Sequence, residues 1–152
     1  MRFVYPYLSK REGTSMIVHF PDVPGATTQV DPDENFDALV SDCLIAALGG
    51  YVVRRQPPPR PSAARTRSTI TLDILTSAKL ALAMAMSDSG ISNVTLAERM
   101  GVTEKIIRRL LDLDHVSRID RLESALTYFD LQLELSIRPK PIVNQDVFRV
   151  QQ

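Results

Sequence analysis

Residues 90–112 read G-I-S-N-V-T-L-A-E-R-M-G-V-T-E-K-I-I-R-R-L-L-D, and this stretch decides the fold. Two short helical patterns are joined here by a glycine, with the spacing of a helix-turn-helix. Ser92 or Asn93 can cap the first helix by accepting from its free N–H groups. Ala97 is small enough for the second helix to cross close by. Gly101 can take the positive φ that a sharp turn needs.

The second helix of this pair has one apolar and one charged face. Thr103 is a suitable N-cap for it. The apolar side carries Ile106, Ile107, Leu110 and Leu111, and the other side carries Glu104, Lys105, Arg108, Arg109 and Asp112. A cation-bearing face that begins at a helix N-terminus is typical of a helix that reads DNA. The alternative is an ordinary helical hairpin whose surface charges are only solvated.

We assign a role on DNA to four polar residues of this face and to the cap Thr103. Lys105 and Arg109 would reach base edges, guanine above all, and Glu104 could accept from a cytosine amino group. Thr103 and the N-terminal amides would seat a phosphate, and Arg108 would contact another. Because one such helix covers few base pairs, we expect a homodimer or tetramer that reads half-sites about one helical turn apart.

The composition is that of an ordinary globular protein. Of the 152 residues, 44% are hydrophobic and 24% are charged. No apolar run approaches the roughly 18 residues of a membrane span, and no secretory segment is visible, so we expect a cytoplasmic protein without a membrane partner. The single Cys43 rules out an internal disulfide. His19 and His115 have no candidate catalytic partner near them in the sequence. We predict neither a metal nor a cofactor.

The net charge of zero hides an asymmetry between the two ends of the chain. Residues 1–50 hold three Lys or Arg against seven Asp or Glu, and residues 51–152 hold fifteen against eleven. We therefore expect residues 1–50 to bind a basic partner and residues 51–152 to contact phosphate groups.

Three strands and a helix are predicted at the start of the chain. The strands are Arg2–Leu8, Ser15–Phe20 and Ala26–Val30, with Lys10–Thr14 as the first turn. Asp31 caps the helix, with Pro32 at its first position. Gly49-Gly50 ends the helix or leaves it frayed. One helix on three strands leaves a sheet edge that needs a partner.

A Pro- and Arg-rich stretch follows, and it divides the chain. Residues 54–67 show no hydrophobic period and hold five arginines, which indicates a semi-rigid linker. Ser68–Leu75 alternates as a strand, which could join the N-terminal sheet or pair with its copy in a second chain. Ser77–Ser89 is an apolar helix. We predict a domain over 1–53, a linker over 54–67, a DNA-binding and dimerisation domain over 68–138, and a tail over 139–152.

The last predicted elements are a helix over Arg118–Phe129 and a strand over Leu131–Ile137. The strand alternates strictly over its seven residues. A lone strand needs a mate, and the simplest mates are the same strand of another subunit or the strand at Ser68–Leu75. The whole pattern predicts an α+β fold, in which a β-β-β-α unit is joined by the linker and a strand to a helical helix-turn-helix unit that ends in a strand.

Two stretches of the chain carry a family resemblance. Residues 1–48, with F-P-D-V-P-G-A-T-T-Q and an amphipathic helix that follows acidic residues, resemble the N-terminal domain of the HicB family of antitoxins. The stretch S-A-K-L-A-L and the later run from Gly90 to Leu126 are similar to the DNA-binding half of HicB members that carry a Cro/repressor-like helix-turn-helix. The order of the two halves also matches. Where the family commonly has G-D-T, this chain has Val30-Asp31-Pro32, and the usual Cys after P-G is Ala26.

The resemblance implies a partial ribonuclease-H-like fold for the N-terminal domain. It further implies that this domain binds the HicA toxin, a small basic mRNA-cleaving ribonuclease, while the other half represses the operon that encodes both proteins. The helix-turn-helix positions that match the family's DNA-facing set are Thr103, Glu104, Lys105, Arg108 and Arg109.

Candidate toxin contacts come from aromatic and turn residues near the sheet edge. They are Tyr5, Tyr7, Asp22, Val23, Pro24 and Gly25. The alternative is that these residues serve only the core and a turn.

Two rival functions follow from the same residues. A two-metal nuclease needs several converging carboxylates, and the three N-terminal strands predicted here contain no Asp or Glu, so we predict that the protein is not an enzyme. A stand-alone helix-turn-helix repressor, whose N-terminal domain senses a ligand or a protein, is the alternative to the antitoxin.

Overall fold

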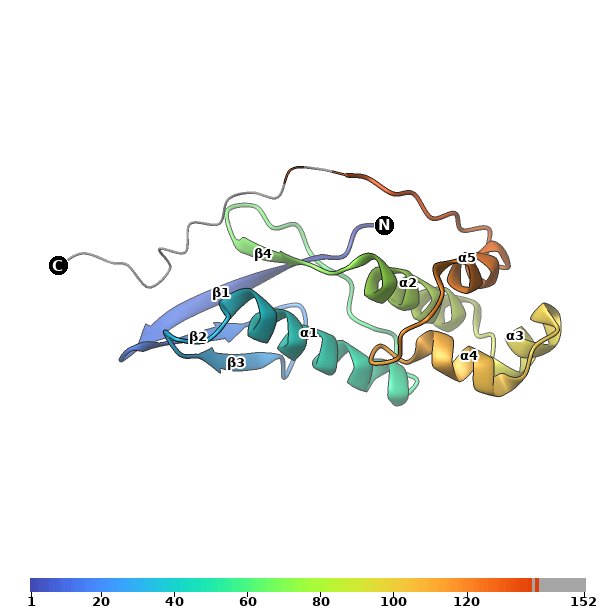
Figure 1. Cartoon of the computed structure of the whole chain (residues 1–152), viewed down its shortest axis with the longest axis horizontal. Coiled ribbons are helices and arrows are strands. Elements are labelled where there is room, and N and C mark those ends of the chain that lie inside the picture. The colour runs from blue at the N-terminus through green and yellow to red at the C-terminus, as the bar shows by residue number, and fades with distance from the viewer. Residues whose placement is uncertain (138, 140–152) are drawn as a thin grey trace.

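The computed structural model describes residues 1–137 and residue 139. Within these residues the chain forms a four-stranded antiparallel sheet and five helices, so the α+β prediction is confirmed (Figure 1). In chain order the elements are β1 Val4–Glu12, β2 Ser15–His19, β3 Thr27–Val30, α1 Phe36–Val53, β4 Ser68–Thr71, α2 Ile74–Ser89, α3 Asn93–Met100, α4 Glu104–Leu111 and α5 Ile119–Thr127.

The sheet has the strand order β3-β2-β1-β4, and β1 serves two partners in turn. Val4–Tyr7 pair with β4, while Leu8–Glu12 pair with β2. Pro6 is tolerated because it lies beyond the end of the β2 ladder, where its missing N–H removes no bond on that side. β1 runs four residues past its predicted end, so the hairpin turn shortens to Gly13 and Thr14.

The predicted start of α1 at Asp31 is wrong. Asn35 caps the helix instead, and its side chain accepts from the Ala38 N–H at 3.1 Å. The Asp31 carboxylate accepts hydrogen bonds from Ser15 and Gln29, which lower its pKa. The Asp31 carboxylate, which the local sequence pattern predicts as a helix cap, therefore binds residues of the sheet instead.

The helix α1 continues through its two central glycines to Val53. Its buried side chains are Val40, Leu44 and Leu48, and they pack against the sheet, which outweighs the weak helix propensity of glycine. Contrary to the sequence-based expectation, this helix is long and apolar enough to cross a membrane, with a mean hydropathy of 1.6 over 18 residues. Core helices of soluble proteins can have the same length and apolar composition as membrane-spanning helices.

The stretch predicted as a linker is fastened to both ends of the molecule. The Tyr5 hydroxyl donates to the Pro59 carbonyl at 2.7 Å. The Ser62 N–H donates to the Asp22 carboxylate at 2.8 Å. Arg60 forms an ion pair with Asp88 of α2 at 2.6 Å, and Pro58 is buried.

The predicted strand over Ser68–Leu75 is only half correct. Its first four residues form β4, which joins the N-terminal sheet beside β1, as one of the two alternatives expected. Asp73 ends the strand because its side chain caps α2, accepting from the Thr76 N–H at 2.9 Å. The helix therefore begins at Ile74 rather than at Ser77.

The predicted strand over Leu131–Ile137 does not form in the single chain. These residues follow α5 without regular secondary structure, and no ladder joins them to the strands that the structure describes. Residue 138 and the tail predicted over 139–152, apart from residue 139, lie outside the described residues.

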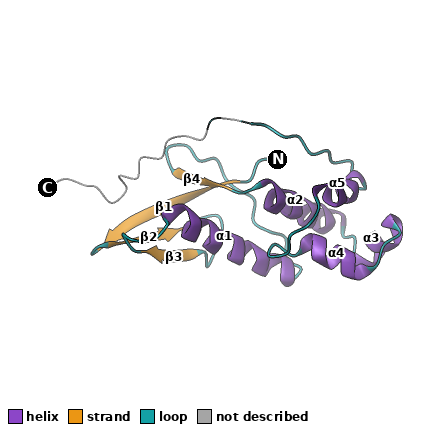
Figure 2. Cartoon of the chain, viewed as in Figure 1, coloured by secondary structure: helices purple, strands orange, loops and turns teal. Residues whose placement is uncertain are grey.

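One hydrophobic core connects the sheet with the helices. Figure 2 shows the strands at one end of the molecule, α2 to α5 at the other, and α1 alongside the sheet. The buried apolar side chains of both ends form one contiguous cluster, from Tyr5 and Val18 in the sheet through Leu80 of α2 to Leu96 and Leu122. The two halves therefore share a core instead of burying separate ones.

Two glycine substitutions test the backbone at the turn and in α1. Gly101 has φ +63°, so Gly101→Ala should cost about 1–2 kcal/mol of unfolding free energy. Gly49 lies inside a helix, where an added Cβ would meet Leu113 Cδ1 at an ordinary 3.8 Å, so Gly49→Ala should stabilise by about 0.5–1 kcal/mol. Urea unfolding of both variants measures the difference, and equal effects would contradict the turn geometry.

Candidate functional site

The turn between α3 and α4 has the local geometry that the sequence predicted. Ser92 caps α3, with its Oγ accepting from the Thr95 N–H at 3.1 Å. Ala97 is 4% exposed, and Gly101 takes the left-handed conformation at the end of α3. The Gly101 and Val102 N–H groups donate to carbonyls of α3 at 3.2 and 2.9 Å, closing the helix end. Two eight-residue helices are thus joined by three residues.

Thr103 occupies the position before α4, but its side chain makes no cap hydrogen bond. Its backbone is extended, with φ −81° and ψ 151°, as expected for a cap residue. The N–H groups of the first turn of α4 therefore have no cap from the Thr103 side chain.

The outward face of α4 carries two cations with no protein partner in the described chain. Ile107 and Leu110 are buried beneath the helix, whereas Lys105 and Arg109 are exposed. Neither cation makes a side-chain hydrogen bond or an ion pair with the described residues. Because they stand four residues apart, they lie on the same face of the helix.

The other two charges of this face are paired with each other. Arg108 donates to Glu104 Oε1 from both Nε, at 3.1 Å, and Nη2, at 2.8 Å. Arg108 is 65% exposed and Glu104 is 32% exposed, so the ion pair lies partly in solvent. Both bonds use one carboxylate oxygen, and Oε2 of Glu104 receives neither of them.

A buried lysine, which the sequence analysis missed, holds the end of α4 in place. Lys79 of α2 is 1% exposed. Its ammonium group donates to the backbone carbonyl of Arg109 at 3.4 Å, and also to the carbonyls of Asp112 and His115. Burial lowers the pKa of Lys79, and the neighbouring carboxylates, Asp112 first, act in the opposite direction.

This arrangement joins three elements with one cation. A positive charge at the C-terminal end of a helix is favourable, because the last carbonyls of α4 have no partner within the helix. The carbonyls of Asp112 and His115 belong to the connection towards α5. Lys79 therefore sets the position of α4 and of the following loop relative to α2.

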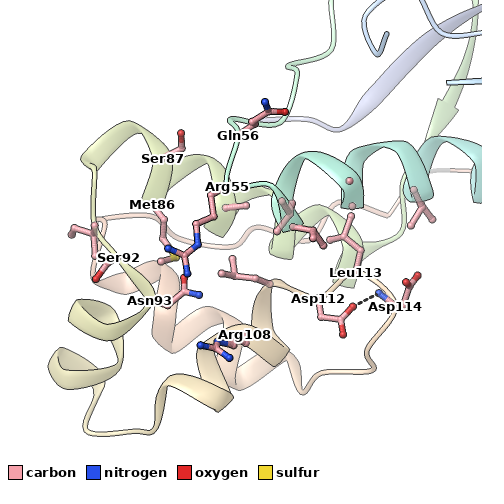
Figure 3. A pocket seen from close by; sticks show the side chains of 18 of the residues that line it. Arg55, Gln56, Met86, Ser87, Ser92, Asn93, Arg108, Asp112, Leu113 and Asp114 are labelled. Atoms are coloured by element: carbon pink, nitrogen blue, oxygen red, sulfur yellow. Dashed lines mark hydrogen bonds between the residues drawn. The ribbon is translucent and has the colours of Figure 1, made fainter. Parts of the chain in front are cut away.

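A pocket of about 770 Å³ lies where the C-terminal half of α1 faces the ends of α2 and α4 (Figure 3). Its apolar wall includes Ile45 and Val52 of α1 and Met86 of α2. Figure 3 shows the Arg55 side chain reaching into the pocket from the end of α1, with Arg108 on the side of α4. The pocket thus has an apolar wall, and charged residues of both signs also line it, namely Arg55, Arg108, Asp112 and Asp114.

The six residues predicted as toxin contacts separate into buried and exposed groups. Tyr5 and Val23 are fully buried, so they belong to the core and cannot offer a docking surface in this structure. Burial and the nearby Asp22 raise the pKa of the Tyr5 hydroxyl. The Asp22 carboxylate is used by the Ser62 N–H.

The remaining three of these candidates reach the surface to different degrees. Tyr7 is half-buried between Phe20 and Phe36, with ring centroids 6.0 Å from each. Pro24 and Gly25 are exposed in the turn before β3. Only this turn is freely accessible.

An acidic surface adjoins this part of the sheet, and it was not among the predicted contacts. Four exposed acidic residues lie in the connection from β3 to α1 and in the first turn of α1, namely Asp31, Asp33, Glu34 and Asp37. They account for most of the negative charge of residues 1–50. The charge count predicted an acidic half, but only the structure shows where its charges gather.

Removing the ammonium group of Lys79 should destabilise the helical half. Lys79→Met keeps the length of the side chain but removes the donor of three backbone carbonyls and leaves no charge in the buried site, which should cost about 2–3 kcal/mol of unfolding free energy. Lys105→Met, the control on the exposed face of α4, should change it by no more than about 0.5 kcal/mol. Chemical denaturation measures both, and equal losses would contradict the structural role of Lys79.

Comparison with known proteins gives three informative relatives. Antitoxin HicB 2 of Photorhabdus laumondii subsp. laumondii is 31% identical over 131 residues, which cover 86% of this chain and 94% of the relative. Antitoxin HicB of Pseudomonas fluorescens is 34% identical over 107 residues, covering 69% and 73%. Antitoxin HicB of Escherichia coli K12 is 29% identical over 136 residues, covering 89% and 98%. No family model matches the chain.

The matches span both the sheet and the helical half of the chain. Antitoxins are regulatory proteins, so the prediction that this protein is not an enzyme is confirmed. With about 30% identity over nearly the full length of two relatives, the chain belongs to the HicB family of antitoxins.

Proposed function

We propose that this cytoplasmic protein is the antitoxin of a type II toxin–antitoxin pair, which binds and neutralises a HicA-like mRNA-cleaving ribonuclease and represses its own operon by binding operator DNA. The observation that carries the DNA-binding part is the open face of α4, where Lys105 and Arg109 stand exposed beside a tight turn. Family membership supports the antitoxin part.

The unit formed by α3, the turn and α4 acts as the helix-turn-helix, with α4 in the major groove of the operator. Lys105 and Arg109 share one face, so both reach base edges, and guanine offers them two acceptors, O6 and N7. The Arg109 side chain does not have to break a protein ion pair before it binds. Its desolvation is the main cost of the contact.

The other polar groups of α4 position the helix on the backbone and add one base contact. The Thr103 hydroxyl and the first N–H groups of α4 receive a phosphate oxygen, because the positive end of the helix dipole favours an anion there. Arg108 reaches a neighbouring phosphate. Glu104 accepts from a cytosine amino group through Oε2, which the bonds from Arg108 leave available.

The active form of the repressor is a homodimer or a tetramer. An eight-residue helix contacts only a few base pairs, which is too little for selective binding. Two copies related by a twofold axis read two half-sites about one helical turn apart.

The sheet end of the molecule binds the toxin, and its N-terminal unit corresponds to the partial ribonuclease-H-like domain. The acidic surface formed by Asp31, Asp33, Glu34 and Asp37 attracts a basic ribonuclease and competes with RNA for its cationic face. The exposed turn at Pro24 and Gly25 lies in the same unit and forms part of the contact. Complementary charge increases the rate of encounter above all.

The second candidate function is a stand-alone repressor with a sensing N-terminal half. The pocket between α1, α2 and α4 favours it, because a ligand there would touch both halves of the chain. A purified protein that binds its operator but retains no basic ribonuclease from the adjacent gene would support this alternative.

Arg109→Ala should weaken operator binding by about 1–3 kcal/mol and relax the preference for one base pair. The loss is sequence-specific because a base-edge contact is removed. Fluorescence anisotropy against the operator and against each single-base variant measures it. Arg121→Ala, at an exposed position on α5, is the control. An equal loss on every DNA sequence would show instead that Arg109 contacts a phosphate.

The double variant Asp33→Lys, Glu34→Lys should slow association with the toxin about tenfold or more at low salt. The difference should shrink as added salt screens the charges. Stopped-flow mixing of the antitoxin with the purified toxin measures the rate. Glu123→Lys, an exposed charge reversal on α5, should leave it nearly unchanged. If the α5 variant slows the reaction as much, the acidic surface is not the docking site.

A further inference from the structure

The pocket between α1, α2 and α4 combines an apolar wall with polar side chains that are not used within the fold. Its volume of about 770 Å³ is typical of sites that bind small organic molecules. Ile45, Val52 and Met86 supply the apolar wall. Arg55 and Asn93 also line the pocket, and their side chains make no hydrogen bond or ion pair with residues 1–137 or 139. The pocket therefore offers both apolar surface and free donors.

Arg55 stands at a backbone position that does not favour arginine. Its N–H donates to the Val52 carbonyl at 3.0 Å, which closes the end of α1 with Arg55 in the left-handed conformation, at φ +55°. The corresponding positions after α2, α3 and α5 hold residue types that adopt this conformation more readily, namely Gly90, Gly101 and Asp130. Backbone strain of this kind is common at binding sites, where a side chain is needed in one place.

The charges that line the pocket are separated along its length. Figure 3 shows the Arg55 guanidinium group pointing towards the side that carries Arg108, whereas Asp112 and Asp114 lie at the far end. The negative charge of both aspartates acts on the buried ammonium group of Lys79. The acidic end thus has a counter-charge within the fold, while Arg55 has none in the described part of the chain. An anion is therefore favoured at the Arg55 end.

We propose that this pocket binds a small amphipathic anion, an organic carboxylate with an apolar chain. The carboxylate accepts hydrogen bonds from the Arg55 guanidinium group and the Asn93 amide. A third donor is Nη1 of Arg108, which the two bonds to Glu104 leave available. The apolar chain lies on the wall formed by α1 and α2 and is removed from water there.

Occupation of the pocket has a regulatory consequence, which rests on the proposed function. Arg108 lines the pocket and is also the proposed phosphate contact of α4. A carboxylate bound beside it takes up a donor and neutralises a positive charge next to the operator. Operator binding should therefore weaken by a similar factor on every DNA sequence, because a phosphate contact carries no information about the bases.

Three probes with the same apolar chain separate the contribution of the head group from that of the chain. Isothermal titration calorimetry of the full-length protein at neutral pH should show octanoate binding at least tenfold more tightly than 1-octanol or octylamine, because only octanoate receives charge-assisted hydrogen bonds from Arg55. Equal binding of 1-octanol would show that the pocket is merely apolar. Tighter binding of octylamine would show that the aspartates dominate. Either result, or no binding of octanoate at millimolar concentration, would overturn the proposal.

Arg55→Gly separates the role of the side chain from the stability of the fold. Glycine removes the guanidinium group and takes φ +55° without strain, so the variant should unfold at the same or a higher urea concentration and bind octanoate about tenfold more weakly. Arg65→Gly is the matched control, because Arg65 is exposed, has φ +53° and does not line the pocket. Equal losses in the two variants would reveal only an effect of net charge. That result, or an unchanged affinity of Arg55→Gly, would contradict the assignment.

A second pair of variants locates the bound chain. Ala46 is exposed and lines the pocket, so Ala46→Phe fills apolar space without entering the core and should weaken octanoate binding about tenfold. Ala38→Phe is the matched control, at an exposed position nearer the start of the same helix and outside the pocket. If both variants bind octanoate equally well, the chain does not occupy this pocket.

The effect on DNA is measured separately, by fluorescence anisotropy of the operator with and without saturating octanoate. Octanoate should weaken operator binding of the unmodified protein more than that of Arg55→Gly, and acetate at the same concentration is the control for ionic strength. Octanoate that binds the protein but leaves operator affinity unchanged would support the pocket and remove its effect on DNA. A protein that fails to bind its operator without octanoate would contradict the proposed function instead, since the calorimetry contains no DNA.

Discussion

The placement of α4 and of the loop after it depends on the hydrogen bonds that the ammonium group of Lys79 donates. This group is buried, and it satisfies carbonyls at the end of α4 and in the loop that follows. Only two residues separate β4 from α2, the helix that carries Lys79, and the second of them, Asp73, caps that helix. Because β4 pairs with β1, the path from the N-terminal sheet to α4 contains one strand, one cap and one buried cation, with no flexible tether.

The continuity of packing joins the two ends of the molecule at which we propose that toxin and DNA bind. Arg60, Ser62 and Pro59 fasten the Pro- and Arg-rich stretch to α2 and to the sheet end, and the apolar core runs through both halves. Figure 1 shows the sheet and the α3–α4 unit at opposite ends of the molecule. The acidic surface and the cations of α4 are therefore far enough apart for two partners to bind one chain without sharing a surface.

The sequence was most informative where structure is local. The cap at Ser92, the small Ala97 and the left-handed Gly101 follow from contacts within a few residues, and all three are observed. The sequence was least informative where a side chain distant in the sequence binds a group that the local pattern assigns to a nearby backbone N–H. Asp31 looked like a helix cap because Pro32 follows it, but Ser15 and Gln29 bind its carboxylate, and Asn35 starts the helix instead.

Burial was the second limit, because a residue type does not reveal which face of an element is covered. Tyr5 resembled a surface contact, yet it is fully buried with its hydroxyl on Pro59. Lys79 stands alone among apolar residues of α2, and that isolation was the available signal. A lysine within an apolar helix is either an exposed exception or a buried cation with specific acceptors, and only the position of the α4 carbonyls decides between them.

The segment Leu131–Ile137 shows a third limit, which concerns the number of chains. Its alternation is a strong local preference for a strand, but a strand is stabilised by hydrogen bonds to a neighbour and by a covered face. In the single chain, Leu133 packs against the core and so covers part of one face of the segment. Residues 132–137 receive no backbone hydrogen bond from the described part of the chain. The local preference and the single-chain conformation conflict only if the chain is taken as the complete folding unit. The hydrogen bonds that this preference requires must come from a strand that the described part of the chain does not place beside the segment.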